Sequence, residues 1–251
     1  MKKLLSALLI GVLAFTVAAC ASNESEELVI LTSAGYEPYE MYDENGVLIG
    51  FDIDMMNAIA DYLEISFVWQ DVDFDGIIAS IQTSQADAAI AGISPTAERA
   101  QFVDFTIVYF NEEAGLVNMM VYDPSKVTIN SNDDLAGLTV GVQLGTIQAG
   151  LLDELSSEIG FTVDPRNQNS VIVQEIINGR IDVLVVERLV ADSIIASNPS
   201  LSSTVLESDL NSPGNAIALP KGSPYLAQFN EAIQALIDNG TVAALVEKWF
   251  N

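Results

Sequence analysis

The feature of this sequence that most restricts its fold is a regular alternation between short apolar runs and segments with a helical apolar period. The runs have the length of buried strands and occupy 28–33, 65–70, 86–92, 103–110, 116–122, 139–144, 181–187 and 215–219. Strands that alternate with helices predict a sheet covered on both faces, with ligands at the carboxyl ends of the strands. Because the alternation restarts near Leu116, the chain is expected to form an α/β fold with one large domain or two lobes.

The helical segments are marked by apolar residues three and four positions apart. In one of them, Asp52 and Asp54 favour the positive N-terminus of a helix. Ile53, Met56 and Leu63 then recur at helical spacing. Further helices are expected at 74–83, 132–136, 147–159, 170–178, 188–197, 224–239 and 241–250.

The segment AGISPTAER, residues 91–99, predicts a helix start that favours an anion. Ser94 at the cap and Pro95 at the first helical position are typical of a helix N-terminus, where unpaired backbone N–H groups attract negative charge. Arg99, in the first turns, can hold a carboxylate through two parallel hydrogen bonds. The segment is therefore interpreted as a receptor for a small carboxylate.

A second helix start of this kind is expected at Gly145-Thr146, immediately before the helix 147–159. For Arg99, the sequence leaves an alternative open, which is an ion pair at the surface with Glu98 or Asp104.

The beginning of the chain has the composition of an export signal. Two lysines precede an apolar run, residues 4–19, that is shorter than the roughly 20 residues needed to cross a bilayer. The run ends in VAAC at Cys20, which resembles a bacterial lipobox. We expect residues 1–19 to be removed, Cys20 to carry a lipid, and residues 20–27 to be a tether. The alternative is an ordinary secretory signal with an incidental cysteine; in either case the mature protein is expected outside the cell, facing the medium or the periplasm.

Composition excludes several kinds of chemistry. The chain contains no histidine and a single cysteine, so a Ser-His-Asp triad, a Cys-His pair and an imidazole metal site are all excluded. The net charge of −26 argues strongly against nucleic acid or an anionic membrane surface as partner, because such partners require clustered Lys and Arg. We expect no metal, no cofactor and no enzymatic activity.

Six segments, in order along the chain, resemble the motifs of one known family. They are Tyr36–Tyr39 (YEPY), Gly50–Met55 (GFDIDM), Phe74–Gly76 (FDG), Ser94–Arg99 (SPTAER), Gly145–Gln148 (GTIQ) and Gly179–Asp182 (GRID). The family is that of the bacterial extracellular solute-binding proteins of family 3, the amino-acid receptors of ABC importers. The resemblance covers essentially the whole mature chain.

The resemblance implies a periplasmic-binding-protein-like fold, in which two Rossmann-like α/β lobes are joined by a two-segment hinge and the ligand lies in the cleft. Lobe 1 is expected to be discontinuous, with residues 28–112 and 214–251, and lobe 2 to comprise residues 113–213. The hinge is expected near 112–115 and 212–215.

The resemblance also implies a site for an amino acid, most readily a polar or basic one. Arg99 would hold the α-carboxylate, and Glu187 would meet the α-ammonium. Tyr36 and Phe74 would flank the side chain. The candidate ligand-binding residues are Tyr36, Phe74, Gly92, Ser94, Arg99, Thr146, Ile147, Gln148 and Glu187, with Ser33 and Gln143 as further candidates. The implied partners are a permease with its ATPase and, through Cys20, the membrane; a monomer is expected.

This chain departs from the family pattern in ways that bear on the ligand. Glu187 stands where the family usually has Asp, and Ser33 stands where receptors for basic amino acids often carry a carboxylate. Glu37 and Glu40 could supply negative charge instead, but we expect both at the surface. A strict histidine or lysine receptor is therefore disfavoured. The alternative function is an enzyme on the same fold that resembles the cyclohexadienyl dehydratases, with Glu187 as general acid.

Overall fold

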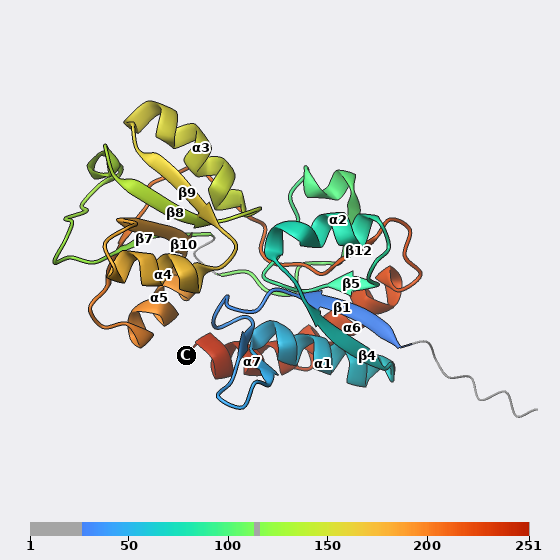
Figure 1. Ribbon diagram of the computed structural model, residues 1–251. Coiled ribbons are helices and arrows are strands. Elements are labelled where there is room, and N and C mark those ends of the chain that lie inside the picture. The colour runs from blue at the N-terminus through green and yellow to red at the C-terminus, as the bar shows by residue number, and fades with distance from the viewer. Residues whose placement is uncertain (1–26, 113–115, 251) are drawn as a thin grey trace, which may run out of the picture.

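Two five-stranded sheets, each flanked by helices, form the cores of two lobes that lie side by side (Figure 1). The computed structural model describes residues 27–112 and 116–250. The predicted mixed α/β class is confirmed. The export signal, Cys20 and nearly all of the predicted tether lie outside the described residues, as do residues 113–115 of the predicted hinge. Within the described part of the chain, no helix combines the length and apolarity needed to cross a membrane.

The first sheet has the strand order β4-β1-β5-β12-β6. Its strands are β1 (Leu28–Thr32), β4 (Phe67–Asp71), β5 (Ala88–Ala89), β6 (Val103–Phe105) and β12 (Ala218–Pro220). β1 runs parallel to β4 and β5, whereas β12 is antiparallel to β5 and β6. A segment from the end of the chain is therefore inserted into the first sheet.

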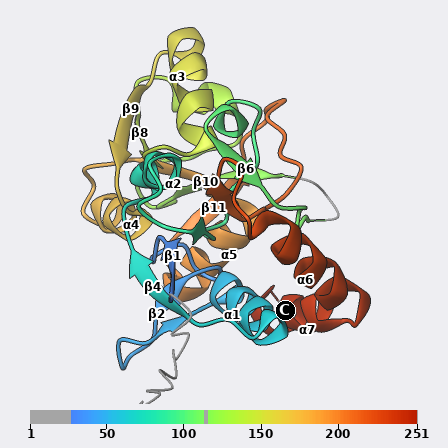
Figure 2. The ribbon, with the colours of Figure 1, turned by 90° about the vertical axis from the view of Figure 1, so that its right-hand side faces the viewer.

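Helices and a small hairpin complete this lobe. They are α1 (Phe51–Leu63), α2 (Ile77–Gln82), α6 (Leu226–Asp238), α7 (Thr241–Phe250), β2 (Met41–Tyr42) and β3 (Leu48–Ile49), with 3-10 turns at Phe74–Gly76 and Arg99–Gln101. α6 and α7 pack beside α1 against the sheet, as the turned view shows (Figure 2). The C-terminal helices thus cover the first lobe.

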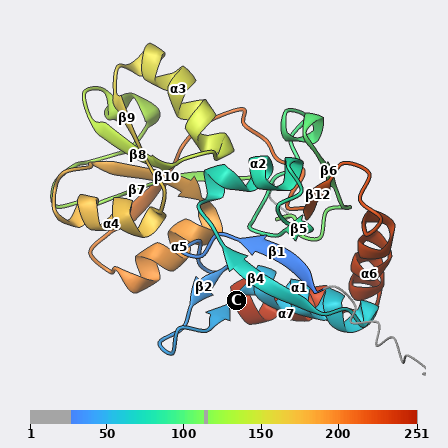
Figure 3. The same cartoon turned by 45° about the vertical axis from the view of Figure 1, so that its right-hand side comes forward.

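The second sheet has the order β11-β7-β10-β8-β9. Its elements are β7 (Asn118–Tyr122), β8 (Thr139–Gln143), β9 (Thr162–Arg166), β10 (Val183–Glu187), β11 (Ser202–Val205), α3 (Ile147–Ile159), α4 (Asn169–Ile177), α5 (Arg188–Ser197) and a 3-10 turn at Asn132–Leu135. α3 lies on one face of the sheet and α4 and α5 lie on the other (Figure 3). Because successive side chains of a strand point to opposite faces, a strand covered on both sides is apolar throughout.

The central strand β10 shows this directly. Leu184 and Val186 belong to the core cluster that includes residues of α4 and α5. Val183 and Val185 belong to the cluster that includes Leu152 of α3. This explains why β10 is apolar from Val183 to Val186, without polar alternation, until Glu187 ends the strand.

Two segments connect the lobes, and they are paired where they leave lobe 1. Phe110 and Asn215 form an isolated antiparallel bridge, in which the N–H of Asn215 donates to the Phe110 carbonyl at 2.7 Å. Gly214 beside it has φ +114°, and a Cβ there would lie 2.3 Å from the Phe110 oxygen. Only glycine fits this position without displacing the backbone.

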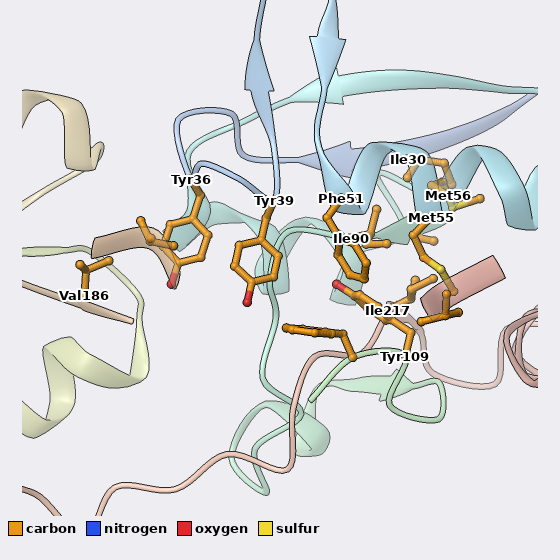
Figure 4. Close-up of a cluster of buried hydrophobic side chains, with 14 of the residues drawn as sticks. Ile30, Tyr36, Tyr39, Phe51, Met55, Met56, Ile90, Tyr109, Val186 and Ile217 are labelled. Atoms are coloured by element: carbon orange, nitrogen blue, oxygen red, sulfur yellow. The ribbon is translucent and has the colours of Figure 1, made fainter. Parts of the chain in front are cut away.

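A row of aromatic rings extends from the lobe 1 core towards the second lobe. Tyr36 and Tyr39 stack with ring centroids 5.5 Å apart, and Tyr39 meets Phe51 edge-on at 6.2 Å. Figure 4 shows Tyr36 at the end of this row that is nearer to Val186 of β10. The row is a rigid support for the surface where the lobes meet.

The prediction of a helix that begins at Ser94 and Pro95 is wrong. The chain forms turns there, and only Arg99–Gln101 adopts a 3-10 helix. Thr96, not Ser94, accepts the N–H of Arg99, through its hydroxyl at 3.2 Å. The physical reason is that the Ser94 carbonyl accepts the N–H of Thr96 and the Nη1 of Arg99, both at 2.9 Å, and so does not accept a helical N–H.

Candidate ligand-binding site

A cavity of about 330 Å³ lies between the two lobes. From lobe 1 it is lined by Ser33, Tyr36, Glu40, Phe74, Ala91, Gly92, Ser94 and Arg99, and from lobe 2 by Gln143, Thr146, Ile147, Gln148 and Glu187. Every candidate ligand-binding residue of the sequence analysis lies on this wall, including the two further candidates. The structure therefore brings the whole predicted set together, and the role of each residue toward a ligand stays a prediction.

Arg99 reaches this wall from the turn after β5. Its Nη1 donates to the Ser94 carbonyl at 2.9 Å, and its Nη2 donates to the Gly145 carbonyl of lobe 2, also at 2.9 Å. No carboxylate of the described residues lies within ion-pair distance of Arg99, so the surface pairing with Glu98 or Asp104 is absent; Asp104 pairs with Lys221 instead. A guanidinium has five N–H donors, so donors remain for an anion.

Gly92 and Ser94 hold the turn beside Arg99 in place. Gly92 has φ +58°, and a Cβ there would lie 3.2 Å from the ring of Tyr36. Its N–H donates to Asp52 at 2.6 Å, so the backbone of the turn is fixed by a buried carboxylate. The hydroxyl of Ser94 lies 2.9 Å from that of Ser212, a residue of the expected hinge that was not among the candidate site residues.

Two aromatic side chains form the lobe 1 wall. Tyr36 is buried against Tyr39 and faces Gly92. The guanidinium carbon of Arg99 lies 5.4 Å from the ring centroid of Phe74, within the range of a cation–π contact. The rings therefore fix the position of the charged group as well as lining the cavity.

The lobe 2 wall is built from the end of β8 and the start of α3. Thr146 caps α3, since its hydroxyl accepts the N–H of Ala149 at 3.2 Å. This second predicted helix start is confirmed. The remaining N–H groups of a first turn have no partner within the helix, and Ile147 and Gln148, at the first positions, line the cavity. The start of α3 therefore favours negative charge in the cavity.

The amide side chains of lobe 2 are held by other residues. Gln143 donates to the Asn167 carbonyl at 3.0 Å, and Gln148 donates to Asn118 at 3.0 Å. Both amides are buried, so their conformations are fixed before any ligand enters.

Glu187 ends β10 at the cavity and is only 6% exposed. Burial and the negative charge of Glu112 raise its pKa to about 7, although contacts with Gln148 and Tyr36 act in the opposite direction. In the described residues no cation forms an ion pair with Glu187. A buried carboxyl in this state gains from a cationic ligand that pairs with it.

The expectation that Glu40 lies at the surface is wrong. Glu40 is 0% exposed and lines the cavity. Behind it, Asp52 accepts hydrogen bonds from the N–H of Gly92 and from the hydroxyl of Tyr109, at 2.6 Å and 2.7 Å. Burial raises the pKa of Asp52 to about 7, and burial together with the charge of Asp52 raises the pKa of Glu40 well above its usual value.

A signal for this buried acid was present in the sequence. Asp52 lies one helical turn before Met56 and two before Ile59, and therefore on the apolar face of α1. A carboxylate on an apolar helix face needs buried partners, which here are Gly92 and Tyr109.

The lobes touch each other at the rim of the cavity. Besides the bond from Arg99 to Gly145, the side-chain amide of Asn167 donates to Asp73 at 2.7 Å. A Cβ on Gly145 would lie 2.7 Å from the Cα of Asp75. The approach of the two backbones is therefore close enough to require glycine.

Comparison with known proteins gives the following matches. The sequence model of the bacterial extracellular solute-binding proteins, family 3, matches residues 28–251. The arginine-binding extracellular protein ArtP of Bacillus subtilis (strain 168) is 37% identical over 257 residues, which cover 100% of this chain and 98% of the relative.

Two solved structures are informative. An ancestral arginine-binding protein bound to arginine has a TM-score of 0.82 and 33% identity, and the match covers 90% of this chain and 98% of that one. The ancestral amino-acid-binding protein AncCDT-1, a precursor of cyclohexadienyl dehydratase, has a TM-score of 0.79 and 29% identity, with 90% and 96% covered.

Proposed function

Because the chain belongs to family 3 of the bacterial extracellular solute-binding proteins, we propose that its cavity binds a single amino acid and presents it to the permease of an ABC importer. Members of this family act outside the cytoplasm, in the periplasm or at the cell exterior. The observation that carries the proposal is the placement of Arg99 and Glu187, a base and an acid, on opposite walls of one cavity.

An α-amino acid carries the complementary pair of charges. Its carboxylate would bind the free N–H groups of Arg99 and the start of α3, where a guanidinium and a helix N-terminus both favour an anion. Its ammonium would bind Glu187, whose buried carboxyl has no cationic partner among the described residues. The walls formed by Tyr36 and Phe74 would enclose the side chain.

Besides the permease, the proposal includes the ATPase and the membrane as partners. The ATPase would act through the permease, and a lipid on Cys20 would hold the receptor at the membrane. The protein would work as a monomer, because both walls of the cavity come from one chain.

The alternative is a dehydratase, which the likeness to AncCDT-1 keeps in view. Glu187, with a pKa near 7, has the acidity that a general acid requires. Against an enzyme stands the placement of Arg99 and Glu187 on opposite walls of the cavity, which suits the carboxylate and the ammonium of an amino acid. Incubation with prephenate or arogenate separates the two functions, and formation of product would establish the enzyme.

A thermal-shift screen of the amino acids tests the receptor, with arginine first because two of the three similar proteins above are named for it. A ligand at 100 times its dissociation constant stabilises a protein by about 2.7 kcal/mol. Agmatine, which is arginine without its carboxylate, is the matched control and should stabilise far less. If no amino acid raises the melting temperature, or if arginine raises it and agmatine raises it equally, the proposal is wrong.

A further inference from the structure

The cavity contains a third acidic group that the backbone of an amino acid leaves without a partner. Glu40 lies at the end of the turn that begins at Tyr36, and its carboxyl lines the cavity. Both of its oxygens are buried and find no hydrogen-bond donor among the described residues. Leaving a buried polar group without a partner costs on the order of 1–3 kcal/mol, and more for a charge.

The protein surrounds Glu40 with further negative charge. Asp52, Asp71 and Glu187 all act on Glu40 to oppose its ionisation. When Glu40 is protonated it can donate to Asp52, which raises the pKa of Glu40, but Asp52 accepts in that contact and gives an ionised Glu40 no donor. None of the ion pairs among the described residues involves Glu40. This part of the cavity wall therefore has more acidic groups than cations to balance them in their ionised form.

The other cavity groups do not correct this imbalance. Arg99 is the only base on the cavity wall, and it is bonded to the carbonyls of Ser94 and Gly145. In the proposed function its remaining donors serve the ligand carboxylate, and the ligand ammonium serves Glu187. Glu40 is then left for the side chain of the ligand.

We propose that Glu40, backed by Asp52, is the specificity-determining residue of this cavity and selects an amino acid with a cationic side chain. A guanidinium or ammonium donates hydrogen bonds to a carboxylate and neutralises its charge. An uncharged side chain leaves the buried carboxylate without a positive charge to pair with. The inference rests on the proposed function and adds to it the chemical class of the ligand.

Calorimetry with arginine and citrulline tests this inference, because the two have nearly the same shape and only arginine is charged in its side chain. The wild-type protein should prefer arginine by on the order of 100-fold, the 2.7 kcal/mol of one good charged contact. Glu40→Gln should weaken arginine binding by about that factor and change citrulline binding much less. Glu40→Asp, which keeps the charge, should retain a clear preference for arginine.

Glu37→Gln is the matched control, since Glu37 lies in the same turn but does not line the cavity; it should leave both affinities unchanged. Equal wild-type affinities for arginine and citrulline would overturn the inference even if Glu40→Gln does not fold. An unchanged preference in a folded Glu40→Gln would also overturn it. In both cases the proposed function survives, because an amino acid still binds. If neither arginine, citrulline nor any other amino acid binds, the proposed function itself is refuted.

Discussion

Arg99 and Glu187 are the two residues whose charges decide which small molecule the cavity accepts. Arg99 stays protonated even though burial lowers its pKa, because a guanidinium begins so far above neutrality. Glu187 begins much closer to neutrality, and burial places its pKa at about 7. The two groups therefore respond differently to mutation and to pH.

Arg99→Ala should weaken binding of the amino acid by roughly 2 to 5 kcal/mol, much of it from the ligand carboxylate that is left buried without a partner. Calorimetry measures this directly. Arg180→Ala is the control, because Arg180 is 66% exposed and pairs with Glu175 on the surface, and it should leave the affinity unchanged. An unchanged dissociation constant in Arg99→Ala would show that Arg99 does not hold the ligand.

The affinity should fall as the pH is lowered below 7. An ammonium is attracted by the ionised form of Glu187, and with a pKa of about 7 the neutral form becomes dominant on acidification. The bound ammonium lowers the pKa of Glu187 in the complex. Between the pKa values of the free and the bound protein, the affinity should fall by on the order of tenfold for each pH unit of acidification. Titrations between pH 5 and pH 8 check the slope, and Glu187→Gln should bind weakly and lose the part of the slope that Glu187 contributes, while the part from Glu40, whose pKa is also raised, remains. A flat wild-type profile would contradict the pairing.

At the scale of elements, the contact between the start of α3 and the turn after β4 controls how closely the lobes approach. Gly145→Ala would place a Cβ about 2.7 Å from the Cα of Asp75 in the other lobe. We expect its affinity for the amino acid to fall by at least about tenfold. Gly160→Ala, at the other end of α3, is the matched control.

Gly160 also has a positive φ, of +87°, but a Cβ there would meet nothing within 4 Å. Both variants should lose roughly 1–2 kcal/mol of stability to left-handed strain. Only Gly145→Ala should lose affinity as well, and an equal effect of both variants on binding would contradict the role of the lobe contact.

Most elements could be predicted from sequence, and those that could not depend on tertiary contacts. The buried strands and α3 follow from local pattern. β9 was missed because Pro165 cannot donate to a ladder, which is tolerated at the edge position that β9 occupies. β11, also an edge strand, has too few apolar residues to show a pattern. The burial of Glu40 depends on its packing against α1, which no local pattern contains.

At the scale of the whole molecule, the periodicity of apolar residues did not decide between one large domain and two lobes. The reason is that the insertion of β12 into the first sheet has no local sequence pattern. The resemblance of motifs supplied the two-lobed arrangement and the cavity residues. What the structure adds is the set of contacts between lobes, such as those of Arg99 with Gly145 and Asn167 with Asp73.

The attachment of the whole molecule to the cell is tested by Cys20→Ala. If a lipid on Cys20 is the anchor, this variant should be processed differently and should appear in the soluble fraction or the medium. Fractionation of cells that express each form, with labelling by a radioactive fatty acid, measures the change. Full retention of the variant in the membrane fraction would show that another attachment exists.

The central claim is that an amino acid binds both lobes at once and thereby stabilises their contact. A ligand shifts a conformational equilibrium only by its difference in affinity for the two states, and here that difference comes from bridging Arg99 and Glu187. Small-angle X-ray scattering with and without saturating arginine, or the amino acid that stabilises most in the screen, is the most direct measurement. We predict a smaller radius of gyration and a shorter maximum dimension with the ligand, and no change for Arg99→Ala at the same ligand concentration. Identical scattering of the wild-type protein with and without a ligand that calorimetry shows to be bound would contradict the claim.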